Sequence, residues 1–127
     1  MKEQLKAVED FHNKFLQELG TEPRLLTDSE SRLRFTLMAE ENVEYLEACE
    51  DSNIVGIADA LGDQLYILCG TILKHGMQHK IEEVFNEIQR SNMSKLGEDG
   101  KPIFREDGKI LKGPNYTKPN IAPILGL

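Results

Sequence analysis

The sequence feature that most constrains the fold is the apolar stretch "IVGIADALGDQLYILCGTIL", residues 54–73. It predicts a helix over about Ile54–His75 that is apolar on most of its sides, with Gly76 as a plausible C-cap. A helix that is apolar all round normally forms the buried centre of a larger protein. We therefore expect the rest of the chain to supply helices that cover it.

Three further segments show helical spacing of their apolar residues, three and four positions apart. The predicted helices are residues 2–19, a segment from the capping-box pattern Thr27–Glu30 to about Glu50, and a segment with Ile81, Val84, Phe85 and Ile88 on one stripe that reaches about Lys95. Short links between helices imply antiparallel neighbours. The expected fold class is all-α, an antiparallel four-helix bundle.

Residues 97–127 differ in composition, because glycine and proline recur along them. Asp107 and Gly108 lie between two short apolar runs, which indicates a hairpin with either a three-residue loop or a tight two-residue turn. The chain of 127 residues is long enough for one domain. We expect a single domain over 1–127, with the helical bundle in 1–96 and a hairpin and extended tail in 97–127.

The charge of the chain limits its partners. The formal net charge is -7 and the pI about 5.0, and an acidic surface repels nucleic acid and anionic membrane. The N-terminus is too charged for a secretory signal, and no apolar run is long enough to cross a membrane. Cys49 and Cys69 lie within apolar helical patterns, which indicates reduced core thiols rather than a disulfide. We expect a cytoplasmic protein without nucleic-acid or membrane partners.

Two aspartates interrupt the apolar stretch. Asp59 and Asp63 are four residues apart, which puts them on one face of the helix. A buried carboxylate is strongly disfavoured unless it is paired, protonated or bound to metal, and no Lys or Arg occurs in this helix before Lys74. A divalent cation is the simplest partner, and ligation by oxygen alone suits Mg²⁺ or Mn²⁺. The alternative is that both aspartates face solvent.

The preceding helix carries glutamates on an apolar arc. At 100° per residue, Glu41 and Glu44 share an arc with apolar residues such as Leu37. Glu40 falls at the edge of this arc, and Glu47 points farther outward. The glutamates either face a site or lie at the rim of a wide core with their carboxylates in water.

The last predicted helix changes character along its apolar stripe, which continues to Asn92 and Lys95. An amide and an ammonium group at this position could hold phosphate oxygens. Equally, Lys95 could simply stabilise the negative end of the helix dipole.

The motif "EENVE", residues 40–44, followed by "DALGD", residues 59–63, resembles the MazG-like, all-α NTP pyrophosphohydrolases. Within them the chain is most similar to the phosphoribosyl-ATP pyrophosphohydrolase-like branch. The stretches "VEDFHNKF", "DALGDQLYILCGTILKHG" and "SNMSKLGEDGKPIFREDGKILKGPNY" also resemble that branch, so the similarity covers most of the chain.

The resemblance implies a four-helix Mg²⁺ site that cleaves nucleoside triphosphates between the α and β phosphates, releasing a nucleoside monophosphate and pyrophosphate. By motif position, it implies that Glu41, Glu44 and Asp63 bind metal and that Glu40 is the base for the attacking water.

The second motif of the family is commonly Glu-x-x-Asp. Here Ala60 stands where that glutamate would be, and the candidate for the missing fourth ligand is Asp59, one residue earlier.

The resemblance also implies roles for residues outside the acidic motifs. Asn92 and Lys95 would contact phosphates. His12 and Phe15, with Phe11, would line a base pocket, although a core role for the phenylalanines is equally consistent with their spacing. Family members assemble as dimers or tetramers, so a homodimer or homotetramer is expected.

Two other hypotheses remain beside the enzyme. One is a non-catalytic regulatory homologue that binds nucleotide and metal, and the other is a helical interaction module with solvated acids. The basic residues Lys101, Arg105, Lys109 and Lys112 either close over a triphosphate or act as ordinary edge-strand charges that discourage aggregation. The sequence does not name the base or sugar that an enzyme would prefer.

Overall fold

The computed structural model describes all residues, 1–127, and contains four α-helices and no strand. The helices are α1 (Lys2–Lys14), α2 (Asp28–Glu50), α3 (Ile54–Lys74) and α4 (Ile81–Met93), followed by a 3-10 helix, η1 (Ala122–Leu125). The predicted all-α class is confirmed. The chain forms two compact units, an N-terminal unit, Met1–His79, and a C-terminal unit, Lys80–Leu127. No helix has the length and hydrophobicity that crossing a bilayer requires.

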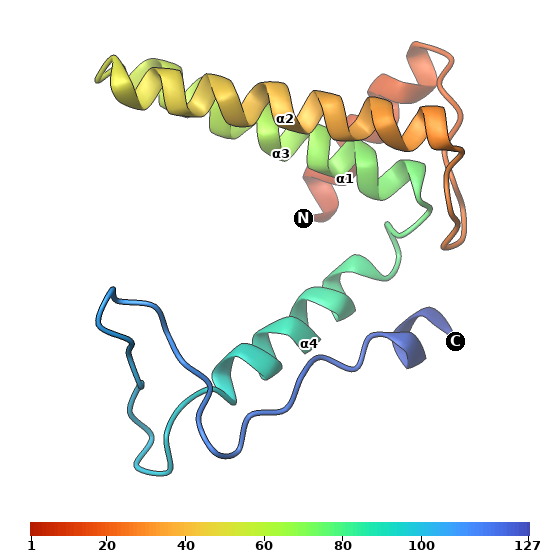
Figure 1. Ribbon diagram of the computed structural model, residues 1–127. Coiled ribbons are helices and arrows are strands. Elements are labelled where there is room, and N and C mark those ends of the chain that lie inside the picture. Colours follow the sequence, from red (N-terminus) through yellow and green to blue (C-terminus); the bar gives the residue numbers. More distant parts are fainter. The chain divides into compact units, whose positions relative to one another are not determined.

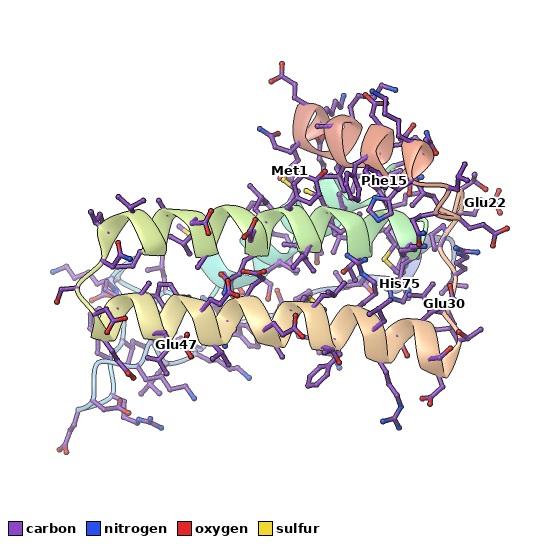
Figure 2. The ribbon with its side chains drawn as sticks, turned by 90° about the horizontal axis from the view of Figure 1, so that it is seen from above. Met1, Phe15, Glu22, Glu30, Glu47 and His75 are labelled. Carbon is purple, nitrogen blue, oxygen red and sulfur yellow. The ribbon has the colours of Figure 1, made fainter.

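In the N-terminal unit, α3 contacts α2 along one side and α1 along another (Figures 1 and 2). α2 and α3 run antiparallel, because the short turn Asp51–Asn53 joins them. The apolar side chains that become buried come from all three helices: Leu5, Val8, Ala48, Ala60, Cys69, Ile72 and Leu73. Neither cysteine forms a disulfide.

The start of α2 is fixed by the capping box that the sequence predicts. The Thr27 hydroxyl accepts a hydrogen bond from the Glu30 amide at 3.2 Å, and the Glu30 carboxylate accepts one from the Thr27 amide at 3.3 Å. Two amides that the first helical turn cannot satisfy thus find partners within the same four residues.

The end of α1 comes earlier than predicted. The helix stops at Lys14 rather than near residue 19, because Leu16 takes a left-handed conformation with φ 57°. The amide of Gln17 then donates to the His12 carbonyl at 2.8 Å, which closes the helix end in the manner of a Schellman motif. This conformation costs a non-glycine residue roughly 1 kcal/mol, and nothing in the apolar spacing reveals it.

The loop after α1 closes the C-terminal end of α3. The amides of Gly20 and Arg24 donate to the carbonyls of Leu73 and His75 at 3.0 and 2.9 Å. Gly76 follows with φ +69° and, as predicted, allows the chain to leave the helix. Carbonyls at the end of α3 therefore bond to a segment about fifty residues away, which anchors α1 to α3.

α3 is less buried than its composition predicts. It lies between α1 and α2, but Ile54, Val55 and Leu61 in its first half are exposed. Two neighbouring helices cover only two sides of α3, so the expectation of an all-round buried helix is wrong for this half. Asp59 and Asp63 are correspondingly exposed and not enclosed by apolar side chains.

In the C-terminal unit, the chain turns back on itself after α4 and its tail returns along that helix (Figure 1). A single antiparallel bridge pairs Phe104 with Ile110. The Arg105 amide donates to the Lys109 carbonyl at 2.8 Å, and Gly108 has φ +87°. Of the two predicted turns this is the three-residue loop, in which a type I turn is followed by a left-handed glycine.

Candidate active site

Three carboxylates from two helices converge in the N-terminal unit. Glu41 and Glu44 are three residues apart on α2, so they lie on the same side of that helix, and Asp63 reaches them from α3. One oxygen from each lies within 4.8 Å of the others. We call these three residues the carboxylate cluster. The antiparallel packing of α2 and α3 is what brings the two sequence motifs together.

Glu41 has the most unusual surroundings of the three. Its side chain is half-buried, and its Oε2 atom is shielded from solvent without any hydrogen-bond partner. Burial, and then the nearby carboxylates of Glu44, Asp63 and Asp59, raise the pKa of Glu41 to about 7. A buried, unpaired carboxylate oxygen is costly, so this atom is one that a cation would satisfy.

Within the N-terminal unit, no side chain supplies that cation. The ion pairs in the structure join Lys6, Arg32, Arg90 and Arg105 to other carboxylates, and none involves the cluster. The donor set is oxygen only, which suits Mg²⁺ or Mn²⁺ better than zinc. Three carboxylates leave coordination positions for water or a phosphate, as Mg²⁺ sites usually do. The residues present therefore fit a divalent cation.

The other acidic residues of the two motifs lie around the cluster. Asp59 is outside it, although its charge contributes to the raised pKa of Glu41. Ala60 is only 1% exposed and belongs to the core. Glu40 is exposed and directly precedes Glu41. Glu47 is also exposed, outside the space between α2 and α3 (Figure 2).

One cross-helix contact beside the cluster was missed by the sequence analysis. The Gln64 amide donates to the Asn42 side-chain oxygen at 3.3 Å. These residues directly follow Asp63 and Glu41, so the bond ties α2 to α3 at the level of the carboxylate cluster. The available signal was the occurrence of an amide side chain immediately after a predicted ligand on both helices.

The predicted pocket residue His12 is part of the helix contact. Its ring is 5% exposed, and its Nδ1 lies 2.8 Å from the Val8 carbonyl oxygen, to which it donates. The ring packs against Gly70, where an added Cβ would lie 3.0 Å from His12 Cε1 and 2.7 Å from an Arg34 nitrogen. Arg34 crosses from α2 and donates to the Ile67 carbonyl. A role for His12 in lining a base pocket stays a prediction, and its position is that of a core histidine.

Phe15 belongs to an aromatic cluster shared by α1 and α3. It is 62% exposed and its ring centroid lies 4.4 Å from that of Phe11. Phe11 in turn meets Tyr66 of α3 edge-on at 5.7 Å. The sequence analysis missed Tyr66, although it follows Asp63 by three residues and so lies one helical turn from the cluster.

The two predicted phosphate contacts, Asn92 and Lys95, lie in the C-terminal unit. Asn92 is exposed near the end of α4, and Lys95 is half-buried just beyond it. The carbonyl of Lys95 accepts a hydrogen bond from the Gly113 amide at 2.8 Å.

Comparison with known proteins identifies the family. Residues 8–92 match the sequence profile of phosphoribosyl-ATP pyrophosphohydrolase, which covers the second half of α1, all of α2 and α3, and most of α4. The chain belongs to this family. The assignment agrees with the resemblance carried by the two acidic motifs, and it places the chain within the MazG-like superfamily.

A solved structure supports the family assignment. The chain is similar to a candidate NTP pyrophosphohydrolase from Exiguobacterium sp. 255-15, with 27% sequence identity and a TM-score of 0.51. The match covers 97% of this chain and 91% of the other. Among curated proteins, none matches the chain. The family and the structural relative both support a pyrophosphohydrolase activity.

Proposed function

We propose that the protein is a Mg²⁺-dependent nucleoside triphosphate pyrophosphohydrolase that releases pyrophosphate and leaves a nucleoside monophosphate. The observation that carries this proposal is the carboxylate cluster, in which Glu41, Glu44 and Asp63 converge without a protein cation and leave Glu41 Oε2 unpartnered. The family match supplies the reaction class. Asp59 is proposed as a further metal ligand, because its carboxylate is near enough to help raise the pKa of Glu41.

In this proposal the cluster holds the metal, and Mn²⁺ is a possible substitute for Mg²⁺. A divalent cation bound there offsets the charge of the polyphosphate and makes the phosphorus a better electrophile. Glu44 and Asp63 are exposed, so their oxygens are open to an ion arriving with its substrate. The buried position of Glu41 fixes one ligand in place before binding.

Glu40 is proposed as the general base. Glu40 is exposed and next to Glu41, and it is not one of the three carboxylates of the cluster, so it is free to accept a proton from a nearby water molecule. The water oxygen attacks the α-phosphorus while Glu40 takes its proton. The bond from that phosphorus to the α,β-bridging oxygen breaks, and the electron pair leaves with pyrophosphate.

The remaining predicted residues have supporting roles in the proposal. Asn92 and Lys95 contact phosphate oxygens through an amide and an ammonium group. Phe15 offers an exposed ring on which a nucleobase can stack, and His12 supports the helix from which it projects. A homodimer or homotetramer is part of the same proposal, and sedimentation equilibrium tests it.

The proposal is tested by incubating the protein with standard and modified ribo- and deoxyribonucleoside triphosphates, with and without Mg²⁺, and measuring pyrophosphate. We expect release from at least one of them, dependent on Mg²⁺ and lost in Glu44→Gln. The matched control is Glu47→Gln, which removes an exposed carboxylate from the same helix outside the cluster and should keep activity.

The same experiment separates the alternatives. Release of pyrophosphate without any need for the cluster would contradict the site assignment. No release from any nucleotide, with Mg²⁺ still bound, would favour a regulatory homologue. Neither release nor metal binding would favour a helical interaction module.

A further inference from the structure

The C-terminal unit brings together two lysines that are distant in sequence. The Gly113 amide bonds to the Lys95 carbonyl at 2.8 Å, so Lys112, directly before Gly113, lies beside the end of α4. A Cβ at residue 113 would overlap the carbonyl oxygens of Leu96 and Lys95, so the close approach requires glycine. The sixteen intervening residues, 96–111, thus return the backbone so that Lys112 follows α4 closely in space. We call Lys95 and Lys112 the lysine pair.

The tail is held against α4 by a set of polar contacts. Ser91 is 1% exposed, and its hydroxyl donates to the Thr117 carbonyl at 2.8 Å. The Thr117 amide donates to the Ser94 hydroxyl at 3.0 Å, and Arg90 donates to the Thr117 hydroxyl at 2.7 Å. These contacts fix the segment that follows the lysine pair, so its position is built into the fold.

The lysine pair has no carboxylate partner. Neither Lys95 nor Lys112 takes part in an ion pair, whereas the nearby Arg90 and Arg105 each pair with an acid of the same unit. Residues 109–127 contain Lys109, Lys112 and Lys118 but no Asp or Glu. In a chain with a net charge of -7, two ammonium groups without an acid partner, one of them on a segment free of acids, favour an anion electrostatically.

Tyr116 holds one of the two ammonium groups. Lys112 Nζ lies 4.7 Å from the centre of the Tyr116 ring, within the range of a cation–π contact. The Tyr116 amide also donates to the Gly113 carbonyl at 3.2 Å, which places the ring on the same turn as the lysine. The contact restricts Lys112 while leaving its N–H groups free to donate to a ligand.

We propose that Lys95 and Lys112, with Lys112 positioned by Tyr116, form a binding site for a polyphosphate chain. Two ammonium groups from segments joined by a backbone hydrogen bond suit an anion that carries several adjacent negative oxygens rather than a single monoester. The identity of this anion as the triphosphate of the substrate or the released pyrophosphate rests on the proposed function. The proposal adds Lys112 and Tyr116 to the residues that recognise phosphate. Of the basic residues in and after the hairpin, it gives this role to Lys112 alone.

The test measures binding of inorganic pyrophosphate to the full chain by calorimetry, in EDTA and at low ionic strength. We expect wild-type protein to bind and Lys112→Met to bind about tenfold more weakly, the loss of one hydrogen bond from a charged donor. Lys109→Met is the matched control, since it removes the same charge about 10 Å away along an extended chain and should bind as wild type. Thermal melts confirm that each variant is folded.

Tyr116 is tested as a positioning residue by two further variants. Tyr116→Phe keeps the ring face and should bind pyrophosphate normally, whereas Tyr116→Leu keeps both charges but should bind more weakly. A purely structural role for the ring would change the melting temperature without separating these two variants in affinity. ATP should bind through the same lysines, and AMP should not.

Three results would overturn the proposal: no binding of pyrophosphate by wild type, unchanged binding in Lys112→Met, or equal losses in Lys109→Met and Lys112→Met. Because the measurement needs neither metal nor turnover, its result is independent of whether any nucleotide is hydrolysed. A protein that binds pyrophosphate through Lys112 but hydrolyses nothing would contradict the proposed function alone.

Discussion

Glu41 on α2 and Glu87 on α4 are the same residue type in opposite surroundings. The Glu87 carboxylate accepts hydrogen bonds from two of the guanidinium nitrogens of Arg90, at 2.7 and 3.0 Å, and from the Asn120 backbone amide at 2.9 Å. These bonds lower its pKa to about 2. Glu41 has no cation near it, and its pKa is raised to about 7 by burial and by neighbouring acids.

The difference separates two uses of a carboxylate. Glu87 is fully satisfied inside the protein, and its bonds join the tail to α4, so it is structural. Glu41 has an oxygen that nothing in the protein satisfies, and two more carboxylates lie beside it. A strongly perturbed pKa in a group without a structural partner is typical of functional sites. The comparison predicts that removing each carboxylate has a different kind of effect.

The largest effect is expected in the carboxylate cluster. Asp63→Asn should lower Mg²⁺-dependent pyrophosphate release by at least about a hundredfold, because losing a direct ligand costs more than losing a residue that only orients one. Its exposed position means that the fold should survive, as circular dichroism can verify. Wild-type turnover in Asp63→Asn and in Glu41→Gln would contradict the site assignment.

The second largest effect is expected on Mg²⁺ affinity, because protons and Mg²⁺ compete for the Glu41 carboxylate. A metal ligand must be deprotonated, and a carboxyl with a pKa of about 7 is mostly protonated at pH 6 and mostly ionised at pH 8. Mg²⁺ affinity should therefore rise about tenfold over this range. Calorimetric titrations at the two pH values measure it, and an affinity that is flat with pH would show that Glu41 does not gate binding.

The same shift sets the pH dependence of stability without metal. The pKa of Glu41 lies above its ordinary value of 4.5, so its contribution to stability is full below pH 4.5 and is lost as pH rises through 7. The melting temperature of the metal-free protein should fall from pH 5 to pH 8. Glu41→Gln, which cannot ionise, should show a smaller fall. An equal fall in both would assign the effect to other groups.

Lys95 is the cationic counterpart of Glu41, because it too has no partner of opposite charge. Lys95 has no acid partner, so Lys95→Ala should raise KM by up to about tenfold, the value of one charged hydrogen bond to phosphate. Stability should change little, because Lys95 lies beyond the last residue of α4. Unchanged kinetics with a lower melting temperature would mean that Lys95 only stabilises the helix end.

The smallest effect on activity is expected at Glu87. Glu87→Gln should leave Mg²⁺ binding intact but weaken the acceptor of the Asn120 amide, so that amide should exchange its hydrogen several times faster. The lowered pKa gives the matching pH dependence, since the stabilisation is present above pH 4.5 and is lost as pH falls towards 2. Hydrogen exchange measured by NMR tests both.

Most of the fold followed from local patterns. The capping box fixed the start of α2, and Gly76 marked the end of α3, because both signals act within a few residues. The end of α1 did not follow, because it depends on a leucine in a conformation that glycine usually takes. The exposure of the first half of α3 did not follow either, since it depends on how many helices pack around it.

The carboxylate cluster was expected from two periodic patterns that placed acids on apolar arcs, together with the family resemblance, which by motif position singled out Glu41, Glu44 and Asp63. The pattern did not reveal that Asp59 would lie outside it, or that Ala60 would be buried at 1% exposure. Nor did it reveal that Lys112 would lie beside the end of α4, since that approach arises from the return of the tail, in which the Gly113 amide bonds to the Lys95 carbonyl. Such long-range contacts carry no periodic signal in the sequence.

The most direct test of the account is a titration with Mn²⁺, followed by electron paramagnetic resonance, on wild type, Glu44→Gln and Glu87→Gln. The account predicts that wild type and Glu87→Gln bind the ion with the same affinity and that Glu44→Gln loses that binding, although each variant removes one glutamate charge. Equal affinity in all three proteins would contradict the claim that Glu41, Glu44 and Asp63 form a metal site.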